Sequence, residues 1–69
     1  MPRKIRQLRA DLKKAGFVKD NKRGKGSHTY WEHPELPGYN VVLSGQDGDD
    51  AQPYQEKDVR EALKRVQST

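Results

Sequence analysis

His28 is the side chain best suited to proton transfer in this sequence. It follows a basic, glycine-containing turn that carries Lys22, Arg23 and Lys25. A histidine can take or give a proton at cellular pH, and cations beside it can hold a phosphodiester in reach. RNA supplies its own nucleophile, the 2′-hydroxyl group, so one histidine with nearby cations could assist cleavage of an RNA strand. An isolated histidine is a weak signal, however, and on local chemistry alone a structural position at the start of a strand is the simpler interpretation.

The residues next to His28 could help to hold such a substrate. The amide groups of residues 24–27, which include Gly26, could form a nest for an anion, and the Ser27 hydroxyl could donate to a phosphate oxygen. Tyr30 shares a strand face with His28, where its ring could stack on a base. These residues therefore predict an RNA-binding surface around the histidine.

The second histidine, His33, is a poor partner for the first. Five positions separate His33 from His28, so in an unbroken strand the two side chains project from opposite faces. A two-histidine acid–base pair and a zinc site are both disfavoured by this spacing, and there is no cysteine to supply a thiolate ligand. We expect His33, which precedes Pro34, to be a turn residue, and we expect neither a metal ion nor another cofactor.

The elements that must position these residues follow from the periodicity of the apolar side chains. Apolar residues recur at helical spacing in residues 3–15 and again from about residue 55 onward. Between these helices, strand-like segments begin at residue 17, at residue 27 and at residue 39. The order α-β-β-β-α predicts an α+β fold, in which a three-stranded antiparallel sheet carries both helices on one face. The other face would be open to solvent.

Size and composition limit the chain to one small domain, residues 1–69. Leu, Ile, Val and Phe make up only 12 of the 69 residues, or 17%, which is below the ~20% at which disorder becomes a serious possibility. Disorder also requires a high net charge, and the net charge here is only +4, so a folded domain is expected. If His28 is exposed, Trp31 on the opposite face should be buried under the helices. No apolar run is long enough to span a membrane, and no signal-peptide core follows Met1, so we expect a cytoplasmic protein.

The charges are distributed unevenly along the chain. Residues 1–31 contain ten basic and two acidic residues, a net charge of +8, whereas residues 32–69 contain four basic and eight acidic residues, a net charge of −4. A basic half in a small domain indicates a polyanionic partner, most often nucleic acid. A basic surface that only aids solubility is an equally good interpretation of charge alone.

The acidic segment 45–53 lacks the pattern of a calcium site. An EF-hand loop beginning at Asp47 would need glycine at position 52 and glutamate at position 58, where the chain has Gln52 and Asp58. We expect a solvated acidic loop, which could also serve as a surface for a basic partner.

Taken together, these motifs resemble the HicA toxin family over nearly the whole chain. The resemblance rests on a basic amphipathic helix, then Ala15-Gly16-Phe17, a basic turn that ends in Gly26-Ser27-His28, and an aromatic strand that ends in His33-Pro34. The stretch from Leu43 to Gln55 is similar to one subgroup of the family.

The resemblance implies a double-stranded-RNA-binding-domain-like fold and a ribosome-independent, RNA-cleaving toxin (an mRNA interferase) that a HicB-like antitoxin neutralises. It places the family's catalytic histidine at His28. With the resemblance, a catalytic role for His28 becomes the favoured interpretation over a structural one. Two alternatives remain at this stage. One is a non-catalytic RNA-binding module, and the other is an interaction protein whose basic face docks an acidic partner.

Overall fold

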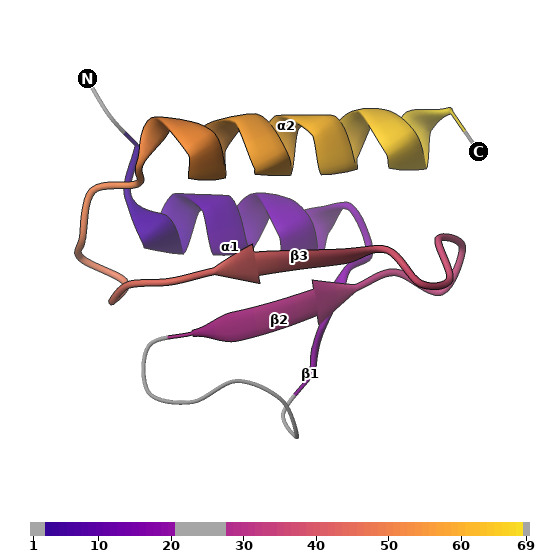
Figure 1. Ribbon diagram of the computed structural model, residues 1–69, viewed down its shortest axis with the longest axis horizontal. Helices are drawn as coiled ribbons and strands as arrows, with labels where there is room; N and C mark the ends of the chain where they lie inside the picture. The colour runs from indigo at the N-terminus through magenta and orange to yellow at the C-terminus, as the bar shows by residue number, and fades with distance from the viewer. Residues whose placement is uncertain (1–2, 21–27, 69) are drawn as a thin grey trace.

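The computed structural model describes residues 3–20 and 28–68, which form two helices and one sheet (Figure 1). The element order is α-β-β-β-α, as the sequence predicts. The elements are α1 (Ile5–Lys14), β1 (Val18–Asp20), β2 (Thr29–Glu32), β3 (Asn40–Leu43) and α2 (Pro53–Gln67).

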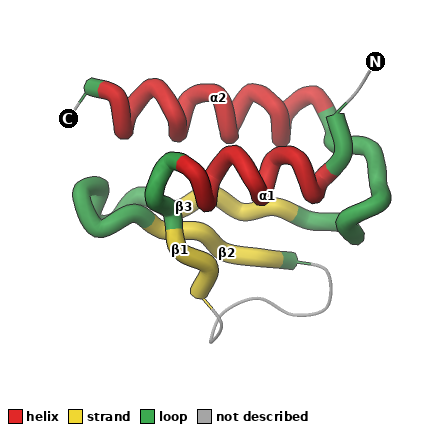
Figure 2. The backbone as a smooth tube through the Cα atoms, turned by 180° about the vertical axis from the view of Figure 1, so that it is seen from behind, coloured by secondary structure: helices red, strands yellow, loops and turns green. Residues whose placement is uncertain are grey.

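The three strands form an antiparallel sheet in the order β1-β2-β3, so β2 is central. Side chains alternate between its two faces, and the buried members are Thr29 and Trp31 on β2 and Val41 and Leu43 on β3. Both helices lie on this buried side, as the views from the front and from behind agree (Figures 1 and 2). The predicted one-sided arrangement, with an open second face, is confirmed.

α1 packs through the stripe that its spacing predicts. Ile5, Leu8 and Leu12 are buried, and the helix stops before Gly16, which has a φ of +100°. A side chain at Gly16 would also be only 2.9 Å from the His33 ring. Glycine is therefore required there both by the backbone and by the space available.

The acidic segment is solvated as predicted, since residues 46–50 are exposed, but its backbone is also docked against the start of α1. The Ile5 amide donates to the Asp49 carbonyl at 2.9 Å, and the Arg6 amide donates to the Asp47 carbonyl at 3.2 Å. The first N–H groups of a helix have no partner within the helix, and here loop carbonyls accept from them. The Lys4 ammonium group also pairs with the Asp50 carboxylate at 2.5 Å.

α2 begins two residues earlier than the periodicity suggests. Pro53 occupies the first turn, where a missing N–H group removes no helical hydrogen bond. Gln55 is buried beneath it, and its amide nitrogen donates to the Ser44 carbonyl at 2.9 Å. This contact holds the start of α2 against the end of β3.

The core is one thin layer between the helices and the sheet. Trp31 is only 2% exposed, which confirms its predicted burial, and its indole N–H donates to the Thr29 hydroxyl at 3.0 Å. That hydroxyl in turn donates to the Leu43 carbonyl at 3.3 Å, so the polar atoms beside the tryptophan are satisfied. Within the described parts of the chain, neither helix is both long and apolar enough to cross a membrane.

Candidate functional site

His28 is exposed and directly precedes β2, at one end of a groove that runs between β3 and α2. The groove has a volume of about 520 Å³. We call it the His28 groove, and its other lining residues are Tyr39, Asn40, Val41, Val42, Ser44, Tyr54 and Asp58. Its walls are thus the outer edge of the sheet and the first two turns of α2.

Two tyrosines give this groove an aromatic character. Tyr54 is 57% exposed at the start of α2. Tyr39 is half-buried, and the Arg65 guanidinium lies 4.7 Å from the centre of its ring. Since Arg65 already covers one face of Tyr39, Tyr54 offers the larger free aromatic surface. An exposed tyrosine ring can stack on an unpaired base, whichever base that is.

The wall formed by α2 is fixed by the Gln55 side chain. Its amide nitrogen contacts both the carbonyl and the hydroxyl of Ser44, at 2.9 and 3.2 Å. Ser44 is itself a lining residue of the His28 groove. The buried glutamine therefore sets the distance between the edge of β3 and the turn that carries Tyr54.

The other predicted RNA-binding residues are only partly placed. Tyr30 lies on the open face of the sheet, opposite Val42 in the β2–β3 register, and is half-buried. Val42 lines the His28 groove, so Tyr30 borders the groove without lining it. The remaining predicted contacts lie outside the described residues: Lys22, Arg23, Lys25, Gly26 and Ser27.

His33 is a structural histidine. Its ring is buried and lies edge-on to Phe17, with 5.0 Å between the ring centres. Its Nε2 contacts the Ala15 carbonyl at 3.1 Å, and its Nδ1 accepts the Glu35 amide at 3.1 Å. The contact with Glu35 agrees with the expected turn position. The structure shows in addition that the His33 side chain is buried. Because both ring nitrogens are engaged, His33 has no free nitrogen for a substrate.

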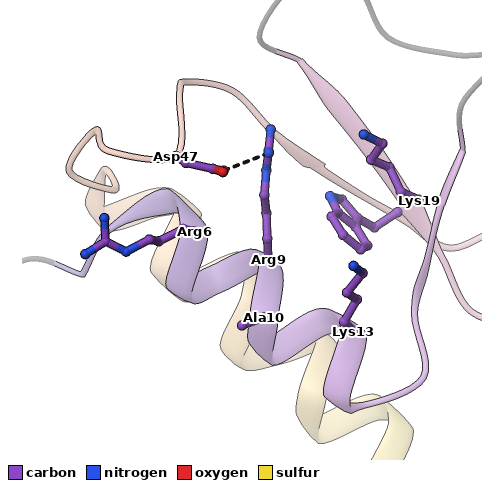
Figure 3. A pocket seen from close by; sticks show the side chains of 7 residues that line it. Arg6, Arg9, Ala10, Lys13, Lys19 and Asp47 are labelled. Carbon is purple, nitrogen blue, oxygen red and sulfur yellow. Dashed lines mark hydrogen bonds and ion pairs between the residues drawn. The ribbon is translucent and has the colours of Figure 1, made fainter.

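A second hollow lies between α1 and the opposite edge of the sheet, and no single motif pointed to it. Its volume is about 500 Å³. We call it the basic cleft, and it is lined by Arg6, Arg9, Ala10, Lys13, Lys19, Trp31 and Asp47. Arg9 and Lys13 rise from α1, while Lys19 reaches across from β1 (Figure 3). The spacing of three and four between the α1 cations was visible in the sequence, but the contribution from β1 was not.

Arg9 is the best-held cation of the basic cleft. Its Nη1 pairs with an Asp47 carboxylate oxygen at 2.8 Å (Figure 3). Its Nε is buried and has no hydrogen-bond partner in the described parts of the chain. One edge of the guanidinium group is therefore satisfied by a carboxylate, and another donor is left without an acceptor.

Comparison with known protein families decides what kind of protein this is. The family model described as the HicA toxin of bacterial toxin–antitoxin systems matches residues 5–67, which is nearly the whole chain. The chain belongs to the HicA toxin family. No curated protein and no solved structure gives a significant match.

Membership of the HicA family establishes the coarse role of the chain. It is the toxin of a toxin–antitoxin pair, so its partner is an antitoxin. The matched residues include the His28 groove and all lining residues of the basic cleft. Among the described residues of this HicA toxin, no three His, Asp or Glu side chains are grouped so that they could hold a metal ion.

Proposed function

We propose that this HicA toxin is an endoribonuclease that cleaves mRNA, with His28 as the residue that transfers the proton. The observation that carries the proposal is the contrast between the two histidines. His28 is exposed in a groove that can take a nucleotide, whereas both ring nitrogens of His33 are engaged in the fold. Of the two histidines, His33 is committed to the fold, whereas His28 makes no hydrogen bond with the parts of the chain that the structure describes.

The chemistry requires that the 2′-hydroxyl group lose a proton and that the leaving 5′-oxygen gain one. The 2′-oxygen of the RNA attacks the adjacent phosphorus, the bond from phosphorus to the 5′-oxygen breaks, and a cyclic phosphate and a 5′-hydroxyl end are formed. His28 makes one of these transfers, as the general base that takes the 2′-hydroxyl proton or as the general acid that protonates the leaving 5′-oxygen, and solvent water makes the other. General acid–base catalysis of this kind contributes about 10²–10⁴-fold in rate.

In this proposal, binding of the substrate is shared among several groups. Lys22, Arg23 and Lys25 hold phosphates next to His28, and Gly26 and Ser27 orient the scissile phosphate. Tyr30 and the two groove tyrosines stack on bases. Asp58 is the acidic residue that lines the groove, so the phosphates must be neutralised by cations from outside it. No metal ion and no other cofactor takes part.

The antitoxin in this proposal is a HicB-like protein, and the toxin acts in the cytoplasm. Binding of any partner to the folded state stabilises a small domain by mass action. A complex with the antitoxin would therefore both silence the toxin and stabilise its thin core.

A non-catalytic RNA-binding module is the second candidate function. The basic cleft favours it, because four cationic side chains gather there, away from His28. Such a protein would bind RNA with a strong dependence on salt but would leave the RNA intact.

Cleavage by a matched set of His28 variants tests the proposal. Purified wild-type, His28→Ala and His28→Gln proteins are incubated with a defined mRNA fragment in EDTA, and the products are resolved by length. We expect both variants to lose about 10²–10⁴-fold in cleavage rate, with unchanged circular dichroism and thermal melting. Lys57→Ala, on the exposed surface of α2, is the control that should cleave normally. Cleavage by His28→Ala at the wild-type rate would exclude His28 as the catalytic residue, and salt-sensitive binding without any cleavage would favour the second candidate.

A further inference from the structure

We propose that the basic cleft is a phosphate-binding subsite for RNA, separate from the His28 groove, and that Asp47 competes with the RNA for it. The inference rests on the proposed function, because it adds a second contact surface for the same substrate. It concerns residues of α1, β1 and the docked acidic loop, none of which lines the His28 groove.

Positive charges converge on the cleft from two elements. Arg6, Arg9 and Lys13 are spaced by three and four residues, which places them along one side of α1. Lys19 is on β1, where it stands opposite Trp31 in the β1–β2 register. Four cations and one acidic side chain therefore line a single hollow of about 500 Å³, and Figure 3 shows Arg6 pointing away from the other three cations.

The bonding of Arg9 suggests which ligand fits there. The planar guanidinium group presents a fork of N–H donors that matches the oxygens of a carboxylate or a phosphate. Asp47 supplies a carboxylate at 2.8 Å to Nη1, while Nε has no acceptor among residues 3–20 and 28–68. Nε shares its edge of the guanidinium group with Nη2, so the Nη1 donors are the ones that a phosphate could take over from Asp47. Asp47 thus occupies part of the place that a phosphate would take.

The cleft lacks what a protein partner would need. Protein interfaces are anchored by exposed aromatic side chains, and charged residues are depleted in their buried centres. The aromatic residue of this cleft, Trp31, is only 2% exposed, so it has almost no surface to offer. Nucleic-acid phosphates, in contrast, are bound largely through lysine and arginine. The balance of charge and apolar surface therefore favours RNA.

The two hollows lie at opposite edges of the sheet. Lys19 belongs to β1, the strand at one edge, and the His28 groove follows β3, the strand at the other edge. A single RNA strand that reaches both must cross about two strand spacings, or roughly 10 Å. The basic cleft would then hold the RNA at a distance from the bond that is cut.

Binding is measured in a His28→Ala background, in which the RNA survives. The probe is a fluorescein-labelled single-stranded RNA of about 20 nucleotides, longer than the ~4–16 nucleotides that one single-strand-binding domain covers. We expect the added pair Lys13→Ala and Lys19→Ala to weaken binding about tenfold and to lower the salt slope by about 1.4, the value for two phosphate contacts. Asp47→Asn should act in the opposite direction and tighten RNA binding about threefold, which is the effect expected of one phosphate contact.

Controls separate a defined subsite from net charge. The pair Lys14→Ala and Lys57→Ala removes the same two charges from exposed positions outside the cleft lining, and Lys14 is the immediate neighbour of Lys13 on α1. Thermal melting confirms that each variant is folded. Equal weakening by both lysine pairs, or no tightening by Asp47→Asn, would overturn the proposal.

The remaining outcomes also decide between the hypotheses. Unchanged RNA binding with weaker antitoxin binding would make the cleft a protein-docking surface and overturn the inference. The proposed function is judged separately, by cleavage in the protein that retains His28. If that protein cleaves RNA but the cleft variants bind RNA normally, the nuclease proposal stands and the subsite is excluded. If the cleft variants bind RNA as predicted but that protein does not cleave it, the subsite stands and the nuclease proposal is excluded.

Discussion

The His28 groove and the basic cleft are almost equal in volume, about 520 and 500 Å³, but are lined by different kinds of side chain. The His28 groove contains a histidine, two tyrosines and one carboxylate. The basic cleft contains four cations, and its aromatic residue is buried. Groups suited to proton transfer and base stacking are thus gathered at one edge of the sheet, and charges suited to phosphate are gathered at the other.

The two hollows also differ in what forms their floor. Trp31 under the basic cleft belongs to the core and is fixed by a hydrogen bond to Thr29. The His28 groove is lined both by Val41, which belongs to the core, and by Val42, which is 38% exposed at the outer edge of β3. A core residue such as Trp31 is linked to the stability of the whole domain, whereas an exposed residue on an edge strand, such as Val42, can be changed at little cost.

Substitution of the two floor residues should give the largest difference. Trp31→Ala is expected to lower the free energy of unfolding by about 3–5 kcal/mol, the usual cost of truncating a buried aromatic residue. The core of a domain of about 70 residues rarely supplies more than about 3–5 kcal/mol, so this variant should be largely unfolded at 37 °C. Val42→Ala should cost less than about 1 kcal/mol, because much of its side chain is already in contact with water.

Urea unfolding followed by circular dichroism measures both variants. Trp31→Phe is the control, since it keeps most of the apolar volume and loses only the contact to Thr29. Equal destabilisation by Trp31→Ala and Val42→Ala would show that the two floors do not differ in this way.

The second contrast concerns how each hollow would hold RNA. Tyr54→Ala is expected to slow cleavage about tenfold at low RNA concentration, within the ~1–3 kcal/mol that stacking on an aromatic residue provides per base. The salt slope of binding should stay the same, because no phosphate contact is lost. Tyr54→Phe should behave as the wild type, since stacking uses the ring and not the hydroxyl.

A change in salt slope would contradict this division of roles. If Tyr54→Ala lowered the slope as the cleft variants are expected to do, the His28 groove would also bind phosphates. Equal loss in Tyr54→Ala and Tyr54→Phe would assign the effect to the hydroxyl group instead of to stacking.

The parts of this fold that could be predicted are those that local periodicity encodes. The stripe of Ile5, Leu8 and Leu12 predicts α1, and alternation along β2 predicts that Trp31 and His28 lie on opposite faces, with Trp31 buried if His28 is exposed. Both patterns depend only on how side chains project from a helix or a strand. The two-layer architecture then follows, because each element has one apolar side to bury.

The docking of the acidic loop could not be predicted in this way. The decisive contacts use the backbone carbonyls of Asp47 and Asp49, which accept from the first turn of α1. Any residue type has a carbonyl group, so the sequence contains no signal for this contact. The acidic side chains predicted only that the loop is solvated, and residues 46–50 are indeed exposed.

The two hollows were recognisable only in part for a similar reason. His28 could be chosen by its chemistry, but the tyrosine that faces it in the groove comes from α2, 26 positions away at Tyr54. The α1 cations share one side of their helix, yet Lys19 joins them only because β1 pairs with β2 beside Trp31. Sites assembled from different elements depend on tertiary packing, which local patterns do not specify.

The smallest expected effect separates two carboxylates of the same loop. Asp47 lies in the basic cleft, whereas Asp50 pairs with Lys4 outside the cleft lining, where their side chains are 57% and 41% exposed. Solvent screens so exposed a pair, so Asp50→Asn should change the free energy of unfolding by less than about 1 kcal/mol. RNA affinity should change by less than about twofold, because the remaining long-range charge effect is screened over roughly 10 Å in 0.1 M salt.

Asp50→Asn and Asp47→Asn each remove one negative charge, at positions only three residues apart. If net charge alone governed RNA binding, the two substitutions would have equal effects on it. A subsite in the basic cleft predicts that only Asp47→Asn tightens it. Fluorescence anisotropy with the labelled RNA, in the His28→Ala background, compares the two directly. If Asp50→Asn tightened binding as much as Asp47→Asn, the contrast between the two hollows would reduce to a general electrostatic field with no preferred place for a phosphate.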